Sequence, residues 1–149
     1  MALQAVSILL VDDNDDDIVL IKDALAESRL INVLDVAHDG EEAIDFLRRQ
    51  GKYKDALEPG LVLLDINMPK KNGFEVLMEV KADPELKHIP IIMLTVSHRD
   101  EEVIKAYREG VCSFVRKPID FCEFQRVVGQ LSLYWALVAT IPHGVRKES

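Results

Sequence analysis

Short apolar runs alternate five times with stretches of helical pattern, and this alternation limits the fold more than any other feature of the chain. Segments such as LVLL and PIIML are apolar at successive positions, as expected of parallel strands that helices cover on both faces. Strands are predicted at residues 6–11, 33–37, 61–64, 91–95 and 113–115. Helices are predicted near residues 15–28, 40–50, 73–82, 99–109 and about 120–138. The pattern predicts an α/β fold with a doubly wound, five-stranded parallel sheet.

The composition of the chain argues against several classes of protein. With 149 residues, 48% of them hydrophobic and 30% charged, the chain can bury the core of one domain. Its net charge of -8 and scattered basic residues argue against a nucleic-acid partner. The first residues carry no basic signal-peptide region and no lipidation signal, so we expect a cytoplasmic protein without a membrane partner. The two cysteines lack the spacing of a zinc or redox motif.

The segment VDDNDDDIVL, residues 11–20, gathers five aspartates within six positions where the first predicted strand ends. A helix start explains part of this charge, because Asn14 or Asp15 can cap the helix and the later aspartates favour the positive end of its dipole. Asp12 and Asp13 come earlier, where two like charges would repel each other. A hard divalent cation such as Mg²⁺ takes oxygen ligands and would relieve that repulsion. A purely structural role for the pair is the alternative.

Polar side chains that suit phosphoryl chemistry follow four of the five predicted strands. In doubly wound sheets, ligands bind at the carboxyl ends of the strands, so these side chains are expected to converge. The residues are Asp12, Asp13, Asp65, Thr95 and Lys117. Asp65 ends a buried central strand and is the predicted nucleophile toward phosphorus, with a metal ion and Lys117 to neutralise the phosphoryl oxygens. Taken singly, each residue could instead be a turn residue, a helix cap or a surface charge.

These motifs occur together in the order and spacing of a known family. An acidic pair, LLDINMPKKNG, LTVS and RKP lie within residues from about 5 to 130. The chain resembles a response-regulator receiver domain of two-component signalling. The resemblance implies a flavodoxin-like (βα)5 fold with strand order 2-1-3-4-5 and a receiver domain over residues 1–130. It also implies a signalling protein whose chemistry is limited to its own phosphorylation and dephosphorylation.

The resemblance implies a role for each matching carboxylate. Asp65 would accept a phosphoryl group from a sensor histidine kinase. Asp12, Asp13 and Asp65, with the backbone carbonyl of Asn67, would bind Mg²⁺ or Mn²⁺. The remaining aspartates of the acidic segment are expected to serve the helix start and the negative field around the site.

Further matches concern the phosphoryl oxygens, the response to phosphorylation and the backbone of the loop after Asp65. Thr95 and Lys117 would bind phosphoryl oxygens, and the bond between Lys117 and Pro118 is expected to be cis. Phe114 matches an aromatic switch position that moves inward with Thr95, although an aromatic that simply faces the core is the alternative. Gly73 matches a glycine where the backbone is left-handed or closely approached.

Two stretches of the chain resemble a subgroup of the family. The stretches KADPELKHIPIIMLT and LYWALVATIP are similar to single-domain regulators that partner bacterial phytochromes, which implies a phytochrome-type kinase. Residues 131–149 are expected to extend the last helix, which is apolar around most of its circumference but too short to span a bilayer. Tyr134, Trp135 and Leu137 are candidates for a homodimer interface, or they fold back on their own domain.

The expected output and the rival functions follow from the same motifs. No DNA-binding segment is expected after residue 130, so output would come from docking, dimerisation or phosphotransfer to a downstream protein. An aspartyl-phosphate hydrolase needs a second acid where this chain has Asn67. A flavodoxin-like cofactor binder would not place VDDNDDD beside a phosphate. A receiver fold that is never phosphorylated remains as a third alternative.

Overall fold

The computed structural model describes residues 6–27, 32–95, 99–101, 113–117, 122–123 and 126. Within these residues, five strands form a parallel sheet in the order β2-β1-β3-β4-β5. The strands are β1 (Val6–Val11), β2 (Asn32–Ala37), β3 (Leu61–Asp65), β4 (Ile91–Thr95) and β5 (Ser113–Arg116). The predicted doubly wound sheet and its strand order are confirmed.

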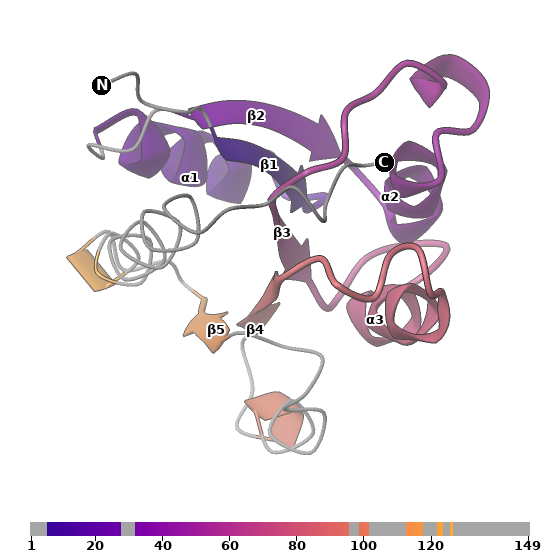
Figure 1. Cartoon of the computed structure of the whole chain (residues 1–149). Helices are drawn as coiled ribbons and strands as arrows, with labels where there is room; N and C mark the ends of the chain where they lie inside the picture. The colour runs from indigo at the N-terminus through magenta and orange to yellow at the C-terminus, as the bar shows by residue number, and fades with distance from the viewer. Residues whose placement is uncertain are drawn as a thin grey trace.

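Helices lie on both faces of the sheet. They are α1 (Asp15–Glu27), α2 (Gly40–Leu47) and α3 (Gly73–Ala82), with the short 3₁₀ helix η1 (Gly51–Tyr53). Figure 1 shows α1 on one face, while α2 and α3 cover the other. Residues 99–101, 122–123 and 126 are also helical and fall within the last two predicted helices. Among the helices that the structure describes, none has both the length and the hydrophobicity that a membrane span requires.

The hydrophobic core has two halves because alternate residues of the central strands point to opposite faces. Leu9 and Leu64 pack toward α2 and α3, whereas Ile8 and Leu63 pack toward α1. All five residues of β3 are buried, which explains its uninterrupted apolar run. Each fully buried leucine or isoleucine stabilises the fold by roughly 1.5–3 kcal/mol. The strands therefore form a rigid frame for side chains at their carboxyl ends.

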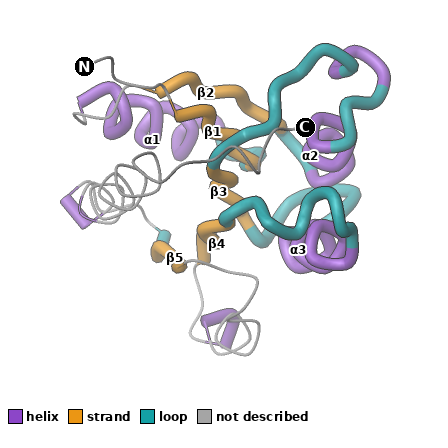
Figure 2. Tube along the Cα trace, viewed as in Figure 1, coloured by secondary structure: helices purple, strands orange, loops and turns teal. Residues whose placement is uncertain are grey.

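Helix α2 is shorter than the sequence predicts. It ends at Leu47 instead of residue 50, because Arg49 adopts a positive φ of 57° and the chain leaves the helical path there. The N–H of Gln50 still donates to the carbonyl of Asp45, at 2.8 Å, so an exposed helix end keeps a hydrogen bond. The loop that follows carries η1 and leads to β3 (Figure 2).

The start of α3 lies directly against the backbone that carries Asp65. Asn72 and Glu75 form a capping box, with backbone-to-side-chain hydrogen bonds of 2.8 and 2.9 Å. The N–H of Gly73 donates to the carbonyl of Ile66 at 2.8 Å. A Cβ on Gly73 would lie 2.3 Å from the carbonyl oxygen of Asp65, so close approach is what requires glycine at this position. The helix thus fixes the loop after β3.

Candidate functional site

Three carboxylates lie together at the carboxyl end of the sheet. Asp12 and Asp13 follow β1, and Asp65 is the last residue of the neighbouring strand β3. One oxygen of each lies within 4.8 Å of the others. Asp12 is fully buried and Asp65 is only 4% exposed, whereas Asp13 is exposed. Adjacent parallel strands therefore bring the predicted acidic residues to one place.

Lys117 extends from the end of β5 into this group of acids. Its Nζ lies 2.9 Å from Oδ2 of Asp12 and 3.2 Å from Oδ1 of Asp65. It also lies 2.8 Å from Oδ2 of Asp17, in the first turn of α1. The backbone N–H of Lys117 donates to the carbonyl of Thr95 at 2.7 Å, which ties the end of β5 to the end of β4. The lysine side chain is 11% exposed, so these ion pairs are largely shielded from water.

Burial and neighbouring charge shift the pKa values of this group. Burial is the main cause that raises the pKa of the Asp65 carboxyl to about 6. The ammonium of Lys117 opposes the shift, and the carboxylates of Asp12 and Asp13 add to it. Burial by itself would lower the pKa of Lys117, but Asp17, Asp12 and Asp65 together raise it above its usual range. Lys117 is therefore a fixed positive charge at neutral pH.

The surroundings of Asp12 fit a divalent cation. Its Oδ1 accepts a hydrogen bond from the N–H of Asn14 at 2.9 Å. Its buried Oδ2 forms the 2.9 Å ion pair with Lys117, and no other described residue donates a hydrogen bond to it. A buried oxygen of this kind, beside two further carboxylates, is a donor set that Mg²⁺ or Mn²⁺ accepts.

The other predicted site residues that the structure describes lie around this group. Thr95 is buried at the end of β4. Asn67 lies in the loop two residues after Asp65, with an exposed side chain. Phe114 of β5 is partly buried and packs against the half of the core under α2 and α3. Pro118, Tyr134, Trp135 and Leu137 lie outside the described residues.

Asp17 is the residue whose contact the sequence did not predict. It lies in the first turn of α1, as expected for a helix start, and its N–H donates to Oδ1 of Asn14 at 3.0 Å. Its carboxylate, however, lies 2.8 Å from Nζ of Lys117, 100 positions further along the chain. The available signal was the excess of aspartates in residues 11–20 over what a helix cap requires.

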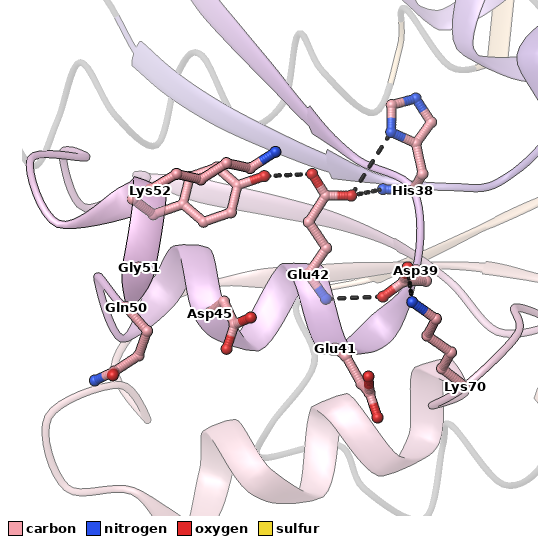
Figure 3. A pocket seen from close by; sticks show the side chains of 10 residues that line it. His38, Asp39, Glu41, Glu42, Asp45, Gln50, Gly51, Lys52 and Lys70 are labelled. Atoms are coloured by element: carbon pink, nitrogen blue, oxygen red, sulfur yellow. Dashed lines mark hydrogen bonds and ion pairs between the residues drawn. The ribbon is translucent and has the colours of Figure 1, made fainter.

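A separate polar hollow of about 490 Å³ lies beside α2 (Figure 3). Within it, Glu42 accepts a hydrogen bond from the N–H of His38 at 2.8 Å and contacts the hydroxyl of Tyr53. Asp39 caps α2 through the N–H of Glu42 and pairs with Lys70 at 3.6 Å. These polar groups largely bind one another.

None of the carboxylates around Lys117 lines the hollow, so we place the candidate chemistry at Asp65. The lining residues are His38, Asp39, Glu41, Glu42, Asp45, Gln50, Gly51, Lys52, Tyr53 and Lys70.

Comparison with known proteins identifies, over most of the chain, the same family that the sequence motifs resemble. A family model described as the response regulator receiver domain matches residues 8–128. The response regulator Rcp1 from Synechocystis sp. is 38% identical over 135 residues, which cover 91% of this chain and 92% of Rcp1.

Solved structures of related proteins have the same fold. The bacteriophytochrome response regulator RtBRR is 39% identical with a TM-score of 0.78, and the match covers 86% of this chain and 78% of RtBRR. The phosphorylated cyanobacterial phytochrome response regulator RcpA is 37% identical with a TM-score of 0.76, covering 93% and 98% of the two chains. The Mn²⁺-bound form of Rcp1 has a TM-score of 0.74 at 38% identity, covering 87% and 94%. The chain therefore belongs to the response regulator receiver domain family of two-component signalling.

Proposed function

We propose that this response regulator accepts a phosphoryl group on Asp65 from a phosphorylated histidine of a sensor kinase. The observation that carries the proposal is the position of the Asp65 carboxylate, which is almost fully buried and lies 3.2 Å from the ammonium of Lys117. Asp12 and Asp13 lie beside it. Phosphoryl transfer depends on a positioned nucleophile and on neutralisation of the phosphoryl oxygens, and this group offers both.

The proposal includes a metal ion in the same group. Asp12, Asp13 and Asp65, together with the backbone carbonyl of Asn67, would hold Mg²⁺ or Mn²⁺. The buried Oδ2 of Asp12, which carries negative charge, and the cluster of three carboxylates support this assignment, as does the Mn²⁺-bound form of the relative Rcp1. When bound, the ion would neutralise charge on the phosphoryl oxygens.

The chain's own residues carry the transfer step. A carboxylate oxygen of Asp65 attacks the phosphorus of the donor phosphohistidine and forms a phosphorus–oxygen bond. The phosphorus–nitrogen bond breaks, and its electron pair stays on the imidazole nitrogen of the kinase. Lys117 would bind one oxygen of the transferred group, and the hydroxyl of Thr95 would bind a second. Thr95 is suitably close in the fold, because β4 pairs with β3 in a register that sets Leu94 opposite Asp65.

Signal output is proposed to follow from Thr95 and Phe114. Movement of Thr95 toward the phosphoryl group would let Phe114 move inward and alter the surface of β4, β5 and the helical residues 99–101. Thr95 and Arg116 are register partners in these strands, which supports a route from Thr95 to the surface at the end of β5. Phosphorylation would thus shift the balance between two conformations of this surface, and the signal would not require turnover of a substrate.

The partners and the domain limits are also proposals. Names of the relatives RtBRR and RcpA support a phytochrome-type histidine kinase as the phosphoryl donor. Residues 1–130 would form the receiver domain. Residues 131–149 would extend the last helix and form a homodimer through Tyr134, Trp135 and Leu137, or dock on a downstream protein. A cytoplasmic location stays a prediction.

Intact-mass measurement after incubation with acetyl phosphate and Mg²⁺ tests the proposed chemistry. We expect the wild type to gain one phosphoryl group, and Asp65→Asn to gain none. The matched control Asp55→Asn removes an exposed carboxylate and should behave as the wild type. A chelator should abolish the gain in every variant. An equal gain in Asp65→Asn would refute Asp65 as the acceptor, and no gain in any variant would leave a receiver fold used as a binding module.

A further inference from the structure

The carboxylate of Asp17 contacts Lys117, and neither capping of α1 nor metal binding accounts for this contact. Its carboxylate lies 2.8 Å from Nζ of Lys117, the shortest of the three ion pairs that this lysine makes with described residues. It does not belong to the group of carboxylates that could share a metal ion, which comprises Asp12, Asp13 and Asp65. Its contact is therefore with the lysine.

The position of Asp17 is fixed by the same turn that orients Asp12. The N–H of Asn14 donates to Oδ1 of Asp12 at 2.9 Å, and Oδ1 of Asn14 accepts from the N–H of Asp17 at 3.0 Å. One asparagine thus connects the buried acid after β1 to the first turn of α1. As a result, the carboxylates of Asp12 and Asp17 reach Lys117 from a single short segment.

Lys117 requires such support because a lysine side chain is long and flexible. An ammonium group on a four-carbon stem has three donors and loses considerable rotamer freedom when it is held in one place. The backbone of Lys117 is fixed to Thr95, but this bond does not orient the side chain. Asp17 is 22% exposed and Lys117 is 11% exposed, so their ion pair is partly shielded from water and stronger than a surface pair.

We propose that Asp17 is a positioning residue, which holds the Lys117 ammonium beside Asp65 so that it meets the incoming phosphoryl group. This inference rests on the proposed phosphorylation of Asp65. In the unphosphorylated protein, the Lys117 ammonium lies 2.8 Å from Asp17, 2.9 Å from Asp12 and 3.2 Å from Oδ1 of Asp65. When Asp65 becomes phosphorylated, the donor that faced its carboxylate turns to a phosphoryl oxygen, while Asp17 keeps the nitrogen in place.

The test compares Asp17→Asn with Asp16→Asn. Asp16 lies in the same helical turn and is exposed, so its substitution removes an equal charge without touching the contact with Lys117. We expect phosphorylation by acetyl phosphate with Mg²⁺ to be about tenfold slower in Asp17→Asn than in Asp16→Asn, the order expected for losing a shielded, charged hydrogen bond. Asp17→Glu keeps the charge and should recover most of the rate. Equal rates in Asp17→Asn and Asp16→Asn would overturn the inference.

A second measurement follows the lysine itself, without metal or phosphodonor. The ¹⁵N–¹H signal of the Lys117 ammonium, identified by its loss in Lys117→Gln, should be visible in the wild type and in Asp16→Asn and should be lost in Asp17→Asn. An unchanged signal in Asp17→Asn would overturn the inference while leaving Asp65 as the acceptor. If the wild type acquired no phosphoryl group, the proposed function would fail as well.

Discussion

Arg116 binds the buried carboxylate of Glu101 through two contacts. Its Nε lies 2.5 Å from Oε2 and its Nη2 lies 3.0 Å from Oε1, a side-by-side geometry in which both carboxylate oxygens are engaged. Glu101 belongs to the helical residues 99–101, and Arg116 ends β5 opposite Thr95. The pair connects the segment after β4 to β5, next to Thr95, one of the two proposed switch residues.

Substitution of Arg116 by Gln is expected to destabilise the protein. The side chain of Glu101 is only 6% exposed, so the change leaves a buried carboxylate without its guanidinium partner. Thermal unfolding should show a lower midpoint for Arg116→Gln than for the control Arg126→Gln, which breaks an exposed pair with Glu123. Equal midpoints for the two variants would mean that the Arg116 pair contributes no more than a surface pair.

The stability of the metal-free protein should depend on pH through Asp65. Its pKa is about 6 in the folded protein, against an ordinary value of 3.8, so the folded state holds this proton more tightly than the unfolded state. The associated stabilisation is fully present below pH 3.8 and is lost as the pH rises through about 6. At pH 7, Asp65→Asn should therefore be more stable than the wild type, by at most about 3 kcal/mol.

Urea unfolding in a chelating buffer between pH 4 and pH 7 would measure this effect. The difference in unfolding free energy between Asp65→Asn and the wild type should shrink as the pH falls below about 6. A difference that stays constant over this range would show that the carboxyl of Asp65 does not titrate there.

Mg²⁺ should stabilise the folded protein through the three carboxylates. An ion that binds only the folded state adds about 2.7 kcal/mol to the unfolding free energy at a concentration of 100 times its Kd. Asp13→Asn removes one of the three clustered ligands and should lose most of this gain, whereas Asp55→Asn should keep it. Chemical unfolding with and without Mg²⁺ measures both. An undiminished gain in Asp13→Asn would place the ion elsewhere.

Gly73→Ala should displace the loop that carries Asp65. The new Cβ would lie 2.3 Å from the carbonyl oxygen of Asp65 and 2.8 Å from Cα of Ile66, and neither backbone atom can give way locally. We expect a loss of about 1–3 kcal/mol of stability, as for other overpacked sites, together with slower phosphorylation of Asp65. The control Met78→Ala truncates an exposed side chain of the same helix and should change neither quantity. Wild-type stability in Gly73→Ala would contradict the close approach.

The order of secondary-structure elements was predictable from the sequence because it depends on local pattern. Strands β1 and β4 have the predicted bounds, and the apolar runs at 61–64 and 113–115 each continue for one residue. Helix α3 also has its predicted bounds, since Asn72 and Glu75 mark its start. The end of α2 was not predictable in this way, because nothing in the sequence indicates that Arg49 adopts a left-handed backbone conformation.

The sequence by itself determined which chemical groups gather at the site. Parallel strands place their carboxyl ends on one edge of a sheet, so residues directly after the strands converge whatever the details of packing. The tertiary structure decided which carboxylates contact the Lys117 ammonium. Asp17 meets Lys117 because α1 packs on the sheet with its first turn facing the end of β5. That contact joins the two ends of the domain, and no local pattern in the sequence encodes it.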